Sequence, residues 1–410
     1  MKISFIVPSR NNLKYLKWSY KSIRKNQGNH EVEICVADDF SDKDMTWDWC
    51  EMMMREDPLF KAIQNKGQER QGLVILNDKL VNEVVTSDIC MIWHADMYLC
   101  PGALDAIEKH MYYEKLNSDN ESYITPVPKE KTIVSLTRIE PPLHPQGQEK
   151  ILLDCGIEPE EFDENKLLQY IKDRLGQFDK VPTTEGIFAP WAFWKKDFQE
   201  IGGHDKLFAP QSKEDSDIFN RFQLNGVKFV QTWEGFVYHM TCRGSRFNPH
   251  SGGAPGKDSE EWKHTTSKNM KNFIRKWGNI VKHDEYMKPI VSPKYNIGFI
   301  VKNCNQQLLL MLEPWCDRIY ADGNIDDYII YEQPNTSFDL LKRVRALESA
   351  RENDIYIKMD GNNLIQQDFE TIAQLPEIIQ DSGELGTFEL GNLKITINSL
   401  ETFEHTLIKN

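Results

Sequence analysis

Long apolar runs, paired cysteines and an excess of positive charge are all missing from this chain of 410 residues. No window approaches the about 20 apolar residues that a membrane-spanning helix needs. The apolar start, Ile3 to Val7, is stopped by Pro8 before it reaches the length of a secretion signal. The eight cysteines form no C-x-x-C pair, which argues against a zinc site or a disulfide framework. We therefore expect a cytoplasmic protein with reduced thiols and no transmembrane segment.

The charge balance excludes one class of partner. The net charge is -14, whereas nucleic-acid binding needs clustered Lys and Arg, so we expect no nucleic-acid partner. A single nucleotide can still bind where a metal ion supplies positive charge locally. A Gly-rich phosphate loop is also missing after the first expected strand, where the chain reads VPSRNN, and this disfavours a nucleotidyltransferase.

Strand-like and helix-like segments alternate over the first hundred residues. ISFIVPS, VEICVADD and DICMIW are typical of buried strands, and amphipathic helical patterns lie between them. This order predicts parallel strands joined by right-handed crossovers. Polar side chains follow each strand directly: Ser9-Arg10, then Asp38-Asp39, then His94 and Asp96. Because ligands of open parallel sheets bind beyond the carboxyl ends of the strands, we expect one site at this edge.

Two later segments also carry polar side chains at the ends of expected elements. Glu214-Asp215 begin a helix and follow a segment that contains Trp191 and Trp194. Carboxylates at a helix start can simply complement its dipole, at about 0.3–1 kcal/mol each. A short strand ends at His239 and enters a loop rich in Gly, Arg and Ser. A lone His at a strand end is more often structural than a ligand, so His239 cannot be assigned a ligand role from its position alone.

Together these motifs resemble the GT-A nucleotide-sugar glycosyltransferases, specifically the inverting family two. FIVPSRNNLKYLKWSYKSI resembles the opening strand and helix of that family, and VADDFSD resembles its second-strand signature. HADMYLCPG stands where the family has D-x-D followed by Pro-Gly, with His94 in place of the first Asp. IGGHDKLF resembles its Gly-Gly-aromatic-Asp turn, and KEDSDIFNRFQLNG its Glu-Asp helix start. The resemblance implies an α/β, Rossmann-like GT-A fold, with a mostly parallel sheet flanked by helices.

The resemblance also implies a role for each motif residue. Asp96 is the direct metal ligand, His239 closes the site from the other side, and His94 ligates the metal or contacts ribose or diphosphate. Imidazole and carboxylate both suit Mn²⁺, whereas Mg²⁺ prefers oxygen, so we expect Mn²⁺ rather than Mg²⁺. The expected donor-binding residues are Pro8, Ser9, Arg10, Asp39, Arg70, Ala95 and Asp96. Asp215 is the expected general base, with Glu214 supporting it, and Trp191 and Trp194 are either acceptor-stacking surfaces or core aromatics.

The activity implied is inverting transfer of a sugar from a nucleotide-sugar donor, UDP-sugar by family habit, to a hydroxyl of a glycan or similar acceptor. Retaining transfer on the same fold stays open, because H-x-D with a distant His mirrors the D-x-H plus His arrangement of some retaining members. A non-catalytic protein that binds nucleotide sugars or glycans is a further alternative, against which the presence of both Asp96 and Asp215 argues. A homo-oligomer is compatible with the sequence.

We expect a glycosyltransferase domain over residues 1–288, with an insertion at about 117–181, a linker at 289–295 and a smaller α/β domain over 296–410. In the last part the pattern begins again. YNIGFIVKNCNQQLLLML parallels KISFIVPSRNNLKYLKWS, DRIYADGNID parallels EICVADDFSD, and ARENDIYIKMDGNNLI parallels EVVTSDICMIWHADMYL. This domain is either a degenerate GT-A-like repeat without transferase activity or a generic α/β unit. A different strand order in the two segments would contradict the repeat.

Overall fold

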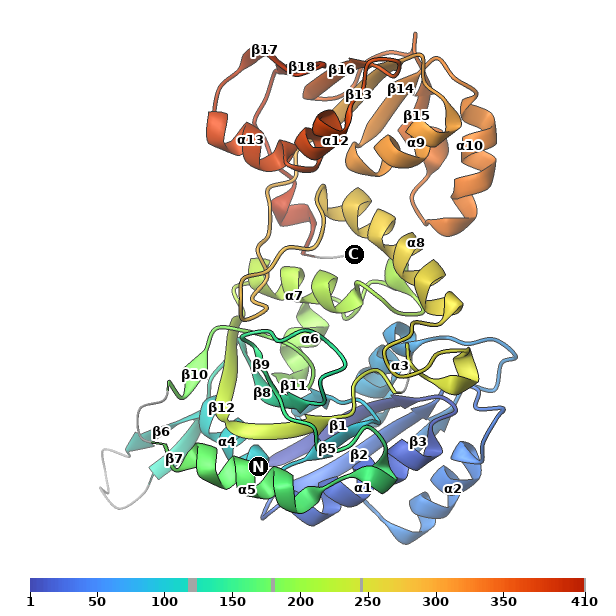
Figure 1. The fold of residues 1–410 in the computed structure, drawn as a ribbon. Coiled ribbons are helices and arrows are strands. Elements are labelled where there is room, and N and C mark those ends of the chain that lie inside the picture. The colour runs from blue at the N-terminus through green and yellow to red at the C-terminus, as the bar shows by residue number, and fades with distance from the viewer. Residues whose placement is uncertain (117–123, 178–180, 244–245, 409–410) are drawn as a thin grey trace. The chain divides into compact units, whose positions relative to one another are not determined.

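The computed structural model describes residues 1–116, 124–177, 181–243 and 246–408 (Figure 1). These residues form two compact units: Met1–Thr265 with His283–Pro289, and Thr266–Lys282 with Ile290–Asn410. Each unit is built from a mostly parallel sheet with helices, which confirms the predicted fold class. Among the helices within the described ranges, none is both long enough and apolar enough to cross a bilayer.

The first unit is organised around one large sheet. Its strands run in the order β10-β12-β8-β11-β4-β1-β2-β3, with β5 paired to β12 and β9 paired to β8. The bounds are β1 (Lys2–Ser9), β2 (Glu31–Asp38), β3 (Phe60–Gln64), β4 (Ile89–Ile92), β5 (Met97–Leu99), β8 (Thr132–Glu140), β9 (Lys150–Leu152), β10 (Thr183–Thr184), β11 (Trp191–Trp194) and β12 (Lys228–His239). As predicted, β1, β2 and β4 are parallel, and β3 extends them. Strand β11 is antiparallel to both β4 and β8.

Helices connect these strands, and those between β1, β2 and β4 and the helix that begins at Glu214 were predicted. They are α1 (Leu13–Asn26), α2 (Thr46–Glu56), α3 (Leu73–Lys79), α4 (Ala103–Met111), α5 (Glu164–Leu175), α6 (Lys195–Glu200) and α7 (Glu214–Leu224). Helices α1 and α2 lie on the same face of β1, β2 and β3 in Figure 1. The first helix buries Leu16 and Ile23, which lie at helical spacing, and it also buries Tyr15. A separate pair of strands, β6 (Tyr112–Leu116) and β7 (Ile124–Pro128), is antiparallel.

Part of the predicted insertion belongs to the main sheet. Every residue of β8 is buried, and the strand lies between β11 and β12 in the middle of the sheet. The sequence TIVSLTRIE is almost continuously apolar or β-branched, as expected of a strand covered on both faces. Residues 117–123 and 178–180 of the expected insertion lie outside the described residues.

The second unit contains a smaller sheet in the order β15-β14-β13-β16-β18-β17. Its strands are β13 (Ile297–Lys302), β14 (Arg318–Ala321), β15 (Val344–Ala346), β16 (Ile355–Asp360), β17 (Gly386–Leu390) and β18 (Leu393–Ile397). Its helices are α9 (Gln306–Leu312), α10 (Ile325–Glu332), α11 (Leu340–Arg343), α12 (Gln366–Ala373) and α13 (Leu375–Ser382), and it also holds the larger part of α8 (Glu260–Trp277). Four strands are parallel and β18 is antiparallel to β16. This order matches β3-β2-β1-β4-β11 of the first unit.

Residues 266–282, which the sequence analysis placed with the first domain, pack with the second unit. The side chain of Arg275 explains this placement. It is fully buried and forms ion pairs of 2.6 Å with Glu313 and 2.8 Å with Glu332. A buried charge is retained only with such partners, so this stretch of α8 is part of the core of the second unit.

Candidate functional site

The carboxyl ends of β1, β2 and β4 border a pocket of about 300 Å³ in the first unit. Because these strands are parallel neighbours, the polar residues that follow them meet at one edge of the sheet. The pocket is lined by Pro8, Ser9, Arg10, Asn12, Asp39, Arg70, Leu73, His94, Ala95, Asp96, Phe188, Gln211, Glu214, Asp215, His239, Cys242, Arg246 and Trp262. Every residue predicted to bind donor or metal, and both predicted catalytic carboxylates, are in this set.

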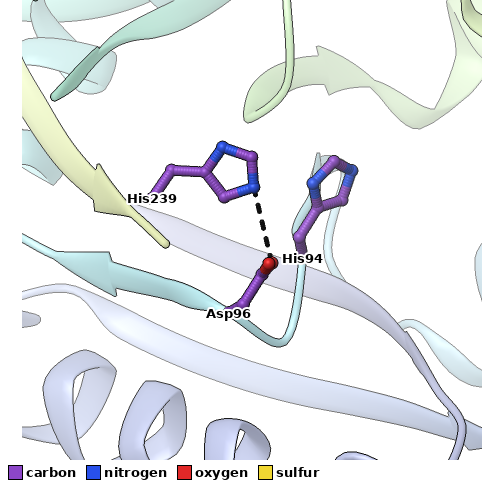
Figure 2. A group of neighbouring side chains, drawn as sticks. All are labelled: His94, Asp96 and His239. Atoms are coloured by element: carbon purple, nitrogen blue, oxygen red, sulfur yellow. Dashed lines mark ion pairs between the residues drawn. The ribbon is translucent and has the colours of Figure 1, made fainter. Parts of the chain in front are cut away.

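Strand pairing brings His94, Asp96 and His239 together. After β4 the chain turns tightly, with the backbone N–H of Met97 donating to the carbonyl of His94 at 3.1 Å. Met97 then pairs with His239 across β5 and β12. Figure 2 shows the result: the Nε2 atom of His239 lies 3.4 Å from the Oδ1 atom of Asp96, with His94 beside them. One ligand atom from each of the three residues lies within 4.8 Å of the others.

The three residues carry different charges. Burial raises the pKa of Asp96, but His239, His94 and the backbone N–H of Arg243 together outweigh burial and hold that pKa at about 2. Burial lowers the pKa of His239, but Asp96 and Glu140 raise it to about 9. Burial and then the charge of His239 lower the pKa of His94 to about 4. At neutral pH the site therefore holds a carboxylate, an imidazolium and a neutral imidazole.

One buried nitrogen in this group makes no hydrogen bond to any described residue. The Nε2 atom of His239 is buried and makes no hydrogen bond among the described residues, although it faces Asp96. The other oxygen of Asp96 accepts a hydrogen bond of 2.6 Å from the backbone N–H of Arg243, so the carboxylate is fixed in place. A buried polar atom without a partner calls for an explanation. A divalent metal ion between the three side chains supplies one, so these residues fit a metal site.

Asp39 holds a loop over the donor end of the pocket. Its Oδ1 atom accepts hydrogen bonds of 2.9 Å from the Asn65 side chain and from the backbone N–H of Gln71. Its Oδ2 atom accepts a hydrogen bond of 2.8 Å from the backbone N–H of Gly72. Arg70, inside this loop, contacts Gln211 at 2.6 Å. The loop that carries Arg70 is therefore tied to the end of β2.

Glu214 and Asp215 face the pocket from the first turn of α7. Glu214 is buried, and its Oε2 atom makes no hydrogen bond within the described residues. Burial, and then the nearby charge of Asp215, raise the pKa of Glu214 well above its ordinary value. Burial also raises the pKa of Asp215. Both carboxyl groups are therefore harder to ionise than free ones, and the pKa of Glu214 is raised more than that of Asp215.

The two tryptophans predicted as acceptor contacts lie elsewhere. Trp191 and Trp194 belong to β11, whose four residues are all buried, and neither lines the pocket. Trp191 packs against Phe193, and the indole N–H of Trp194 donates to a backbone carbonyl at 2.8 Å. An inner strand is covered on both faces, so neither ring is open to stack on a sugar. Both tryptophans pack as core aromatics, which was the second of the two interpretations given above.

Other aromatic and charged groups reach the site without a sequence signal that singled them out. Phe188 and Trp262 line the pocket, and the guanidinium of Arg138 stacks 3.8 Å above the Phe188 ring. The carboxylate of Glu140 accepts a hydrogen bond of 2.8 Å from His239. Phe188 is a single aromatic residue outside the strands, and Glu140 is the last residue of a buried strand. Neither belongs to a repeating sequence pattern, so only the order of the strands in the sheet brings them to the site.

The chain is similar to known glycosyltransferases. Residues 4–126 match the family model described as "Glycosyl transferase family 2". No curated protein matches the chain. Similar solved structures include GalNAc-T7 with UDP, GalNAc and Mn²⁺, with 15% identity and a TM-score of 0.44, covering 70% of this chain and 49% of that one. Another is TarS 1–349 of S. aureus, with 15% identity and a TM-score of 0.40, covering 58% and 60%.

A third is a mannosyltransferase of Pyrobaculum calidifontis in complex with GDP-Man and Mn²⁺, with 14% identity and a TM-score of 0.40, covering 76% of this chain and 70% of that one. The match thus spans 49% and 60% of the lengths of the first two structures. The parallel strand order, the polar edge at the ends of β1, β2 and β4, and the family match over residues 4–126 agree with one another. Residues 4–126 of the first unit therefore resemble glycosyl transferase family 2, and the unit has the α/β fold that this resemblance implies.

Proposed function

We propose that the chain transfers a sugar from a nucleotide-sugar donor to a hydroxyl group of a glycan or similar acceptor, with inversion at the anomeric carbon. One observation carries the proposal. Residues from separate segments of the chain, predicted to bind donor, to bind metal and to act as base, all border the same pocket. Chance clustering of so many strand-end and helix-start residues around one cavity is a poor alternative explanation.

The metal would be held by Asp96, His239 and His94. One carboxylate oxygen and two imidazole nitrogens suit Mn²⁺ better than Mg²⁺, which prefers an all-oxygen shell. When bound, such an ion acts as a Lewis acid that stabilises negative charge on the departing diphosphate. The residues themselves fix its place, because Asp96 is anchored to the backbone of Arg243.

The donor would extend from this metal site toward Asp39. The nucleoside lies along Pro8, Ser9 and Arg10, and we propose a uridine nucleotide on the strength of the family resemblance. Asp39 already accepts three hydrogen bonds from the chain, and a carboxylate offers about four acceptor positions, so one remains for a base N–H. Arg10 and Arg70 line the pocket with cationic groups that suit the diphosphate.

Asp215 would take the proton of the acceptor hydroxyl as that oxygen attacks the anomeric carbon. It lines the pocket, and burial raises its pKa less than that of its neighbour Glu214. The hydroxyl becomes more acidic as the new bond forms, so a carboxylate within hydrogen-bond reach is a sufficient base. Attack from the side of Asp215, opposite the diphosphate, inverts the anomeric centre.

The acceptor sugar would pack on Phe188. Unlike Trp191 and Trp194, this ring lines the pocket, and its stacking on Arg138 fixes its orientation. An aromatic ring held rigid by a neighbouring guanidinium presents a flat apolar face of the kind that sugar rings cover. This assignment replaces the tryptophans of the sequence prediction.

The test starts with donor hydrolysis across UDP-, GDP- and dTDP-sugars, with Mn²⁺ and with chelator. We expect turnover of one donor with Mn²⁺ and its loss on chelation. Hydrolysis of none of the donors, together with no nucleotide binding, would favour a non-catalytic binding protein. The anomeric configuration of the product, followed by NMR, separates inversion from retention, and a retained configuration would contradict Asp215 as base.

Asp215→Asn tests the base directly. We expect kcat to fall by about 10²–10⁴-fold while donor affinity stays as in the wild type, because the amide cannot accept the proton. Glu214→Gln is the matched control, because it makes the same change from carboxyl to amide one residue earlier in the same helix turn. Its loss of kcat should be much smaller. Normal turnover of Asp215→Asn, or equal losses in both variants, would refute the assignment.

A further inference from the structure

Glu140, at the end of β8, touches the back of the metal-site histidine. Its Oε1 atom lies 2.8 Å from the Nδ1 atom of His239, on the side of the ring opposite Asp96. The side chain is 2% exposed, so this contact is shielded from water. The ring of His239 is therefore flanked by two carboxylates, one facing the pocket and one behind it.

Two buried cations fix the carboxylate of Glu140. Arg138 donates to Oε1 at 3.1 Å, and Lys150 donates to Oε2 at 3.1 Å. Arg138 is 7% exposed and Lys150 is 8% exposed at their side chains. The carboxylate of Glu140 thus has a cation against each of its two oxygens, which compensates for the burial of its charge. Glu140 is thus a fixed anion and acts as a hydrogen-bond acceptor only.

The contact with Glu140 determines the tautomer of His239, that is, which ring nitrogen carries the hydrogen atom and which carries the lone pair. Because the carboxylate of Glu140 can only accept a hydrogen bond, the neutral ring must carry its hydrogen atom on Nδ1. The lone pair of the ring then lies on Nε2, where it can bind a metal ion. Nε2 is the buried atom without a hydrogen-bond partner in the described part of the chain. Carboxylates behind metal-binding histidines fix the tautomer and the ring orientation and make the nitrogen more basic.

We propose that Glu140 is a positioning residue, which sets the tautomer and orientation of His239 so that its Nε2 atom binds a divalent metal ion. Arg138 and Lys150 hold Glu140 in turn. The inference rests on the proposed metal-dependent function, and it assigns a role to strand β8 that neither the motif resemblance nor the family match over residues 4–126 covers.

A purely structural role predicts a different result. In that case the network of Arg138, Glu140 and Lys150 only joins β8 to β9, and its loss lowers stability without changing the metal site. Glu149 provides the matched control. It also accepts a hydrogen bond from Arg138, at 3.2 Å, but the contact with the Nδ1 atom of His239 is made by Glu140. Glu140 and Glu149 thus both accept a hydrogen bond from Arg138, and they differ in contact with the ring of His239.

The experiment measures Mn²⁺ affinity directly, by calorimetric titration and by the loss of the free Mn²⁺ electron-paramagnetic-resonance signal, on the full chain without donor. Glu140→Gln should weaken Mn²⁺ binding by about 10–100-fold, and Glu149→Gln should leave it as in the wild type. Transfer by Glu140→Gln should recover at saturating Mn²⁺, so the defect appears in the Mn²⁺ requirement rather than in kcat.

Each outcome bears on a different claim. A wild type that binds no Mn²⁺ overturns the proposed function together with this inference. A wild type that binds Mn²⁺ and a folded Glu140→Gln that binds it equally well overturn this inference alone, as do equal losses in the two variants. If Glu140→Gln does not fold, Glu140→Asp and Glu149→Asp replace the pair. The shorter carboxylate keeps the charge but withdraws from Nδ1, so only Glu140→Asp should lose Mn²⁺ affinity.

Discussion

His239 is protonated on both ring nitrogens, and so positively charged, in the metal-free protein because two carboxylates flank its ring. Asp96 and Glu140 together raise the pKa of His239 to about 9. Only the neutral ring binds a metal ion, so the ion and the proton compete for the Nε2 atom. The charge state of one side chain thereby links metal affinity to pH.

We predict that Mn²⁺ affinity rises with pH up to the pKa of His239 and levels off above it. The sign follows from the raised pKa: below about 9 the ring is protonated in the metal-free state, and binding must displace that proton. The expected slope is about one log unit of affinity per pH unit between pH ~6.5 and ~8. Calorimetry in buffers of different ionisation enthalpy should show about one proton released per ion. Affinity independent of pH over this range, with no proton release, would contradict the assignment of His239 as ligand.

Single residues differ in how far their roles follow from sequence. His94, Asp96 and His239 were identifiable because each ends an apolar segment, and polar groups at strand ends gather at one edge of a parallel sheet. Glu140 also ends a strand, but β8 fell in the expected insertion and gave no reason to place it near His239. Trp191 and Trp194 are buried in β11 and do not line the pocket, and composition alone does not show whether an aromatic strand lies inside the sheet.

At the scale of one loop, Gly72 has a backbone that only glycine adopts easily. Its φ is +81°, and its N–H donates to Asp39 at the end of β2. A Cβ atom added to Gly72 would lie 2.2 Å from the carbonyl oxygen of Pro210. The loop that joins β3 to α3 therefore passes against the segment before α7 with no room for a side chain.

We predict that Gly72→Ala destabilises the protein more than Gly202→Ala. The control has nearly the same φ, +82°, but a Cβ atom added there would have no described atom within 4 Å, so it carries the backbone cost of about 1–2 kcal/mol alone. The clash with Pro210 should add about 1–3 kcal/mol. Nucleotide affinity should fall only for Gly72→Ala, because its loop carries Arg70. Denaturant unfolding and nucleotide titration measure the two effects, and equal losses in both variants would show that the loop adapts.

Elements with regular periodicity were predictable, and interrupted ones were not. The spacing of Leu13, Leu16 and Ile23 identified α1, and the apolar runs identified β1, β2 and β4. Strand β12 was expected only over residues 236–238 but spans Lys228–His239, because an irregularity between Thr232 and Phe236 breaks the alternation. Strand β3 was missed because, at the sheet edge, it is mostly half-buried and has no clear pattern.

At the scale of the whole chain, the two sheets share a strand order and a register. Phe5 pairs with Ile34 and Met91 in the first unit, and Phe299 pairs with Ile319 and Ile357 in the second. The sequence parallel had aligned Phe5 with Phe299 and Met91 with Ile357. This agreement supports our proposal that residues 296–410 are a shortened repeat of the GT-A core.

The repeat lacks the chemistry of the first unit. His94 corresponds to Asp360 and Asp96 to Asn362 in the aligned segments. The six-stranded sheet of the described residues has no counterpart of β12, the strand that supplies His239. The Asp360 carboxylate instead accepts a hydrogen bond of 2.9 Å from the Asn303 side chain, which is exposed to water. We infer that the second unit binds no metal ion with the geometry of the first.

We predict that Asp360→Asn leaves Mn²⁺ affinity and transfer within about two-fold of the wild type, since Asp360 does not line the pocket of the first unit and surface substitutions outside a site change free energies by about 0.5 kcal/mol or less. Asp96→Asn, the same substitution at the first unit's metal ligand, should abolish measurable Mn²⁺ binding and transfer, because the charged oxygen that faces His239 is lost. Both variants replace an aspartate by an asparagine. They differ only in whether that aspartate follows β4 in the first unit or ends β16 in the second. Calorimetry and a transfer assay on the full chain measure both. Loss of Mn²⁺ binding in Asp360→Asn would mean that the second unit takes part in the metal site, and the shortened repeat would then need a catalytic role.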